Sequence, residues 1–115
     1  MVHVTLDLSK ITRAGLTEII VANEQGAGYF DAYGDSSGTR LHGKRIGTWD
    51  EVKAESASMI DSGKGVAFTV FKKNDVRLMR GRELQPRRLA WAGLNYILPA
   101  NTLQFAYDIE FGEHV

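Results

Sequence analysis

The sequence contains no cysteine, only two prolines and no excess of charge of either sign. The absence of cysteine excludes disulfide bonds, iron–sulfur clusters and thiolate-ligated zinc, and it suits a protein of a reducing compartment. A net charge of zero removes the bulk electrostatic argument for nucleic-acid binding. We therefore expect a cytoplasmic protein that depends on neither disulfides nor thiolate-bound metal.

Long apolar runs are also missing from the chain. The residues from Val2 to Leu8 alternate between apolar and polar, so they do not form the continuous apolar region of a signal peptide. No other apolar run approaches the length needed to cross a bilayer. The sequence therefore predicts neither classical export nor insertion into a membrane.

What remains is the composition of an ordinary globular protein. Apolar residues make up 43% of the chain and charged residues 24%, which argues against disorder or a disulfide scaffold. A length of 115 residues is enough to bury one core but not two. We expect a single domain that spans residues 1–115, without internal repeats or a linker.

Alternating apolar residues predict several β-strands along the chain. The pattern favours strands over 2–8, 17–21, 29–33, 89–98 and 103–111, and a β-hairpin formed by 66–71 and 76–80. A helix remains the alternative for 9–22 and for 87–98. The stretch 34–47 is rich in glycine and polar residues and is expected to be an exposed loop.

One main helix is predicted over about 48–62. Thr48, followed by Glu51 at the third helical position, fits a capping box, in which the two residues satisfy each other's free backbone amides. Apolar residues recur from Trp49 onward at helical spacing, and Gly63 stands where a helix often ends. The expected fold class is therefore α+β: a curved antiparallel sheet or small SH3-like barrel that carries this helix.

The segment from Phe68 to Arg82 resembles the hairpin of small phage-encoded proteins with an SH3-like β-barrel. In those proteins a strand of aromatic and β-branched residues leads into Lys-Lys-Asp-Gly, and the returning strand ends in Met and Arg. This chain departs from the pattern because Asp75 is followed directly by Val76 instead of glycine. The resemblance implies a phage or mobile-element origin and a small binding domain, and it carries over no catalytic residue.

The most distinctive feature of charge is the basic segment 72–88. It holds seven of the fourteen basic residues of the chain, against the two acidic residues Asp75 and Glu83. Guanidinium groups pair with phosphates and carboxylates, and neighbouring aromatic rings can stack on a base or fill a pocket of a partner. We predict that the partner-binding residues are Arg77, Arg80, Arg82, Arg87, Arg88, Trp91 and Tyr96.

Motifs for catalysis or cofactor binding are poorly developed. The fragment 62–65 (Ser-Gly-Lys-Gly) lacks the first glycine and the hydroxyl residue of a phosphate-binding loop. The three histidines have no metal-ligand spacing, and His42 shares only a polar loop with Asp35 and Ser36 or Ser37, which offers no rigid support for a catalytic triad. The sequence predicts no catalytic residue, no cofactor and no metal.

These observations favour binding without catalysis. We expect a small phage-type accessory protein that recognises, or recognises and inhibits, a host protein or nucleoprotein through the basic segment and the aromatic residues near it. Direct binding of nucleic acid through 72–88 is the alternative, and a small enzyme of unknown class is the third hypothesis. The exposed edges of a short-stranded sheet also allow a homodimer.

Overall fold

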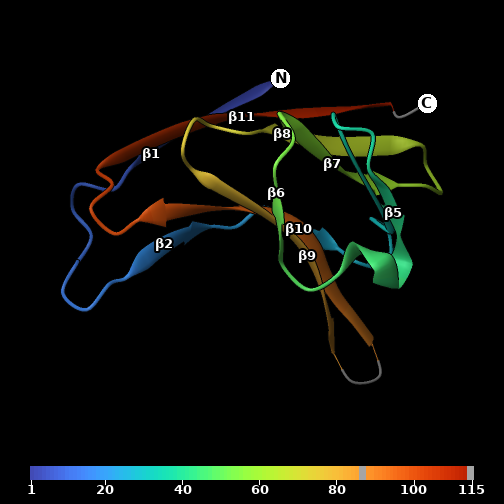
Figure 1. The fold of residues 1–115 in the computed structure, drawn as a ribbon, viewed down its shortest axis with the longest axis horizontal. Helices are drawn as coiled ribbons and strands as arrows, with labels where there is room; N and C mark the ends of the chain where they lie inside the picture. The colour runs from blue at the N-terminus through green and yellow to red at the C-terminus, as the bar shows by residue number, and fades with distance from the viewer. Residues whose placement is uncertain (86–87, 114–115) are drawn as a thin grey trace.

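Two antiparallel β-sheets make up the fold in the computed structural model, which describes residues 1–85 and 88–113 (Figure 1). The six-stranded sheet has, from one edge to the other, β1 (Val2–Asp7), β11 (Gln104–Glu113), β8 (Val66–Phe71), β7 (Ser56–Asp61), β4 (Ala32–Asp35) and β5 (Arg40–His42). A short 3₁₀-helix, η1 (Gly43–Ile46), follows β5.

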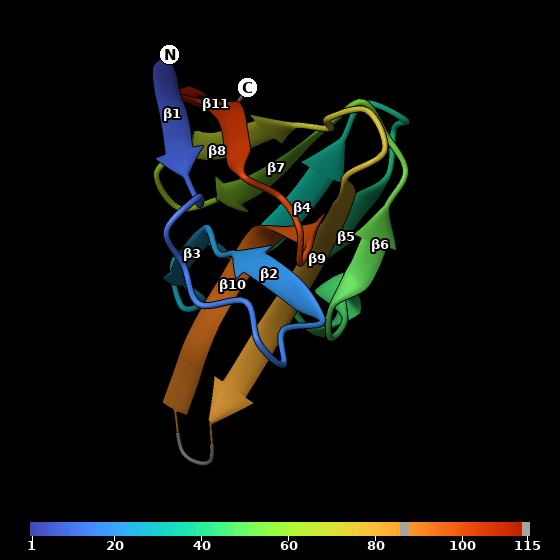
Figure 2. The same ribbon diagram turned by 90° about the vertical axis from the view of Figure 1, so that its left-hand side faces the viewer.

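The second sheet has five strands and is organised around one long hairpin. Its order is β2 (Glu18–Val21), β10 (Arg88–Pro99), β9 (Arg77–Gln85) and β6 (Asp50–Val52), and β3 (Glu24–Gly26) pairs with another part of β10. Figures 1 and 2 both show β9 and β10 extending past the rest of the protein as an arm. A β-bulge shifts the register of this hairpin between Leu89 and Trp91.

The core lies between the two sheets. Alternate residues of each strand point inward, as the period of two along a strand requires. The largest side chains that are fully buried come from both sheets: Tyr33, Met59 and Val70 from one, and Val52, Leu78, Leu94, Tyr96 and Leu98 from the other, together with Ile46 of η1. The aromatic rings of Tyr96 and Phe105 meet edge to face across the two layers, with their centroids 5.0 Å apart.

A buried polar network joins the sheets beside this aromatic contact. Tyr107 of β11 donates its phenol proton to Asn23 Oδ1 at 2.9 Å. The side-chain amide of Asn23 donates to the carbonyl of Leu94 at 3.1 Å, and its backbone N–H donates to Asn95 Oδ1 at 3.1 Å. Because each of these hydrogen bonds replaces one to water, the buried polar groups are satisfied at the point where the sheets meet.

The predicted helix over 48–62 is wrong. This segment forms β6 and β7, and the fold is not α+β but two antiparallel sheets, in place of one curved sheet or barrel with a helix. Trp49 has a φ of 57°, which no right-handed helix tolerates. Gly63 belongs to the turn between β7 and β8, where Asp61 accepts hydrogen bonds from the backbone of Lys64 and Gly65, so the glycine marks a hairpin and not a helix end.

The hairpin predicted from 66–71 and 76–80 is also wrong as a pairing, although both strands form. β8 pairs with β7 and β11 in the six-stranded sheet, whereas β9 pairs with β6 and β10 in the other. The chain between them therefore crosses from one sheet to the other. The resemblance to phage SH3-like proteins, which rested on these two strands, stays a prediction.

Other strand predictions are confirmed. Strands occupy 2–7, 18–21, 88–99 and 104–113, so the helical alternatives for 9–22 and 87–98 do not occur in the described residues. The expected loop 34–47 is partly ordered, because it contains β5 and η1. The strand predicted at 29–33 begins later, at Ala32. None of the helices in the described part of the chain has the length and apolar character of a membrane span.

Candidate docking surface

The outer face of the five-stranded sheet carries a group of aromatic, apolar and charged side chains beside a cavity. Along β9 and β10 the residues that point away from the core alternate with buried ones such as Leu78 and Leu94. We call this surface the tryptophan face and define it by six residues: Trp49, Arg77, Met79, Glu83, Trp91 and Ile97.

Glu83 joins the two tryptophans of the chain. Trp49 Nε1 donates to one carboxylate oxygen of Glu83 at 2.9 Å, and Trp91 Nε1 donates to the other at 2.9 Å. Hydrogen bonds to an ionised acceptor are stronger than those between neutral groups. One carboxylate therefore fixes the orientation of two large aromatic rings, of which that of Trp91 stays 40% exposed.

Trp49 reaches this position through an unusual backbone conformation. Its φ of 57° lies in the left-handed region, which bulky residues seldom adopt. Its indole lies against Gly81, where a Cβ would be 2.4 Å from Trp49 Cδ2. The backbone N–H of Arg82 donates to the carbonyl of Gly47 at 3.0 Å and so anchors the segment that leads to Trp49. Strained residues of this kind cluster at functional sites.

A cavity of about 390 Å³ opens on the tryptophan face. Glu18 and Ile20 of β2, Glu24 of β3 and Asn95 of β10 line it together with Trp49, Arg77, Met79, Glu83 and Ile97. A Cβ at Gly93 would lie 3.1 Å from Glu24 Cγ, so this glycine leaves the space that the Glu24 side chain occupies. The cavity thus combines an apolar lining with three carboxylates.

Arg77 is paired with a carboxylate of the protein itself. Its Nε donates to Glu51 Oε1 at 2.8 Å, and this hydrogen bond lowers the pKa of the Glu51 carboxyl. The pair keeps the guanidinium group on the tryptophan face without leaving an uncompensated positive charge there.

The predicted site residues are divided between two faces. Arg77 and Trp91 lie on the tryptophan face, whereas Arg80, Arg82 and Tyr96 point to the inner side of the sheet. The Arg80 guanidinium lies 4.8 Å from the centre of the Tyr33 ring, and Arg82 donates to the carbonyl of Ala27 at 3.3 Å.

Tyr96 is fully buried among core residues, and its phenol donates to the carbonyl of Phe71. Burial raises the pKa of this phenol well above its usual range. Arg87 lies outside the described residues, and so does the side chain of Arg88. The structure therefore brings two of the seven predicted residues together on one exposed surface.

Sequence reasoning missed Trp49 and Glu83. The helix predicted over 48–62 places Trp49 in an apolar stripe, and Glu83 stands in the sequence as one of two acidic residues within the basic segment. The usable signal was the residue type, because tryptophan is enriched at binding surfaces. The common hydrogen-bond acceptor of the two tryptophans has no signature in sequence spacing.

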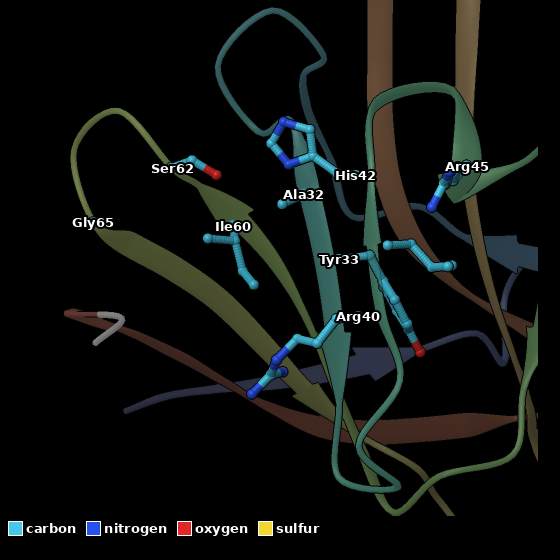
Figure 3. Close-up of a pocket in the computed structure, with 9 residues that line it drawn as sticks. Ala32, Tyr33, Arg40, His42, Arg45, Ile60, Ser62 and Gly65 are labelled. Atoms are coloured by element: carbon cyan, nitrogen blue, oxygen red, sulfur yellow. The ribbon is translucent and has the colours of Figure 1, made fainter.

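A second and larger cavity, of about 620 Å³, lies around β4 and β5 (Figure 3). Ala32 and Ile60 form part of its wall, and His42 lies 3.5 Å from Asp31, not beside Asp35. In Figure 3, Arg40 and His42 point toward opposite ends of the strands, and Arg45 lies apart on η1. A catalytic site requires polar groups that converge on one point, and the polar groups of this cavity do not.

The nominal triad of the loop is not assembled. Asp35 accepts hydrogen bonds from the hydroxyl groups of Ser37 and Tyr33, at 2.5 and 2.7 Å, and so serves to order the β4–β5 turn. Within residues 1–85 and 88–113, no three histidine and acidic side chains gather as a metal site would need. Comparison of the chain with protein-family models, with curated proteins and with solved structures gives no match.

Proposed function

We propose that this protein is a non-catalytic binding protein that recognises another protein through the tryptophan face. The observation that carries the proposal is the attachment of Trp49 and Trp91 to the single carboxylate of Glu83. These hydrogen bonds hold both rings in defined orientations on the outer side of the sheet, as a surface that presents aromatic rings to a partner requires. Rings held in place before binding lose little conformational entropy when a partner arrives.

The composition of the tryptophan face supports a protein as the partner. Tryptophan, methionine and arginine are enriched in the centres of protein interfaces, and tryptophan and arginine dominate binding hot spots. Ile20, which is 58% exposed, and Ile97 extend the apolar area beside Trp49. Exposed apolar and aromatic side chains that lie together among polar residues are typical of an interaction site.

Nucleic acid receives less support as the partner of this surface. Glu18, Glu24 and Glu83 line its cavity, and Arg77 is paired with Glu51, so phosphate groups would meet mainly negative charge. Arg80 and Arg82, which would have added to a basic face, lie on the other side of the sheet. A protein partner does not require a continuous basic surface.

We further propose that the partner belongs to a bacterial host and that the protein acts in the cytoplasm. The resemblance of the segment 68–82 to phage proteins motivates the first point, and the lack of cysteine motivates the second. Inhibition of the partner is the simplest consequence for a small domain that carries one docking surface.

A capture experiment with matched variants tests the proposal. The wild-type protein and the Trp91→Ala and Phe111→Ala variants are immobilised and exposed to a bacterial lysate with and without nuclease. Phe111 is an exposed aromatic residue of the other sheet and serves as the control. We expect a stoichiometric partner that survives nuclease, is retained by Phe111→Ala and is lost by Trp91→Ala. Recovery of nucleic acid alone, or equal retention by both variants, would contradict the proposal.

A further inference from the structure

The cavity of the tryptophan face has a marked preference of charge. Three carboxylates, those of Glu18, Glu24 and Glu83, line it, and among the described lining residues the one cation, Arg77, is already paired with Glu51 at 2.8 Å. An anionic group that entered this space would be repelled, and a cation would be attracted. The group that complements the wall is a cation.

The carboxylate of Glu83 can accept hydrogen bonds from such a cation. Each of its oxygens accepts one indole N–H, at 2.9 Å in both cases. A carboxylate oxygen has two lone pairs, so each oxygen keeps the capacity to accept a further hydrogen bond. The two indoles therefore orient the carboxylate and leave each of its oxygens able to accept one more hydrogen bond.

The remaining wall suits the stem of a long basic side chain. Ile20, Met79 and Ile97 provide apolar contacts for methylene groups, in the manner in which lysine and arginine bury their stems against apolar surface. Trp49 adds an aromatic ring, and ring faces attract ammonium and guanidinium groups. The volume of about 390 Å³ accommodates one such side chain.

We infer that this cavity receives a positively charged side chain, lysine or arginine, from the surface of the partner protein. This inference rests on the proposed function, because it identifies the group by which the tryptophan face recognises its partner. The partner surface is then basic around that residue, and attraction between opposite charges guides the two proteins together.

The two indole N–H groups give a direct readout, because the chain has only two tryptophans and both donate to Glu83. The full chain labelled with ¹⁵N is titrated with Nα-acetyl-arginine amide, Nα-acetyl-lysine amide and Nα-acetyl-citrulline amide while both indole signals are followed. Citrulline has nearly the shape of arginine but no charge. We expect the arginine or lysine probe to shift both indole signals and the citrulline probe to leave them in place.

Variants of the cavity test which residues bind the cationic probe. Glu24→Gln and Glu18→Gln remove charge from the wall and are expected to weaken binding of the cationic probe about two- to fivefold each, the range typical of the loss of one exposed ion pair. Glu110→Gln, an exposed glutamate on β11 of the other sheet, is the matched control and should leave the titration unchanged. Equal shifts with citrulline, or no shift with either cation, would overturn the inference.

The result is separable from a failure of the proposed function. Trp91→Ala can abolish capture of a partner while the indole signals do not shift with cationic probes. In that case the docking surface stands, and the inference that its cavity receives a basic side chain is wrong. If no partner depends on Trp91 while the cationic probes still bind, the cavity recognises cations and the protein-docking role of the tryptophan face is wrong.

Discussion

Gly81 and Gly93 lie directly opposite each other on β9 and β10, and each leaves space for a side chain on the tryptophan face. The indole of Trp49 occupies the space above Gly81, and the backbone carbonyl of Asn23 together with Glu24 occupies that above Gly93. Glycine in the interior of a strand weakens it and often marks a place where another group approaches closely. The sheet thus accepts two glycines side by side where the proposed docking surface requires room.

A methyl group at Gly81 is expected to displace Trp49. In Gly81→Ala the new Cβ would lie 2.4 Å from the indole and 2.5 Å from the backbone nitrogen of Trp49, so the chain must shift. We expect a loss of about 1–3 kcal/mol in the free energy of unfolding, typical of overpacking. Urea unfolding measures it. Gly112→Ala is the control, because a Cβ there meets no heavy atom within 4 Å, and equal stability of the two variants would contradict the account.

Replacing Glu83 by glutamine is expected to break the symmetric attachment of the two indoles. The amide accepts hydrogen bonds only through its oxygen, and its NH₂ group faces the other indole N–H donor. In Glu83→Gln one of the two indole signals should move toward the position of an unbonded N–H, and stability should fall by about 1 kcal/mol. The signals are read from ¹H–¹⁵N spectra. If both stay in place, Glu83 does not fix the rings.

The phenol of Tyr107 is expected to stabilise the packing of the two sheets against each other. Tyr107→Phe removes its hydrogen bond to Asn23 Oδ1 and leaves that buried acceptor with one partner fewer. We expect a loss of about 1–2 kcal/mol in the free energy of unfolding, measured by urea. Tyr29→Phe is the control, since Tyr29 is 71% exposed, and it should change stability little. Equal effects of the two changes would argue against the network.

Acid is expected to destabilise the β4–β5 turn through Asp35. Burial alone would raise the pKa of this carboxyl, but hydrogen bonds from Ser37, Tyr33 and Thr39 outweigh it and hold the pKa below the ordinary 3.8. Because the folded-state pKa is the lower one, the contribution to stability is present above the ordinary pKa and is lost as pH falls through the folded value.

The corresponding experiment follows urea unfolding between about pH 2 and pH 7. The wild-type protein should lose stability as the pH falls below about 4, and Asp35→Asn should lose less of it over the same interval. Asp75→Asn, at an exposed turn position, should keep the wild-type dependence on pH. An unchanged dependence in Asp35→Asn would exclude this carboxyl as its source.

Strands with clear alternation could be predicted from the sequence, but their partners could not. The five large apolar residues of 103–111 indicated β11, and the run 66–71 matched β8. Neither pattern contains the information that β8 pairs with β7 and β11 while β9 pairs with β10, because pairing depends on how two sheets bury their inner faces together. Short-range turn signals favoured the wrong hairpin for that reason.

The helix prediction for 48–62 failed for a different reason. Its capping-box residues and its final glycine satisfy the local signals of a helix, but the same residues also serve a strand and a tight turn. Ala57 and Met59 point to the core with a period of two, and Ser58 pairs with Thr69 across β7 and β8 through a hydroxyl contact of 2.6 Å. Burial between two sheets outweighed a helical preference that is worth only tenths of a kcal/mol per residue, as an order of magnitude.

The candidate site was only partly visible in the sequence. Arg77 and Trp91 were predicted as contact residues and lie on the tryptophan face. The prediction included both Arg77 and Arg80 because both belong to the basic segment 72–88, but an odd spacing in a strand places two side chains on opposite faces. The link from Trp49 to Glu83 spans 34 positions of the chain and arises only from the pairing of strands.

Site-specific photo-cross-linking tests the central claim, the role of the tryptophan face as a protein-docking surface, most directly. A photoreactive p-benzoylphenylalanine is placed at Ile20, which lines the cavity, or at Glu110, on the outer face of the other sheet, and each protein is irradiated in a nuclease-treated lysate. The account predicts one discrete protein adduct from position 20 and none from position 110. An adduct from position 110 alone, or none from either position, would contradict it.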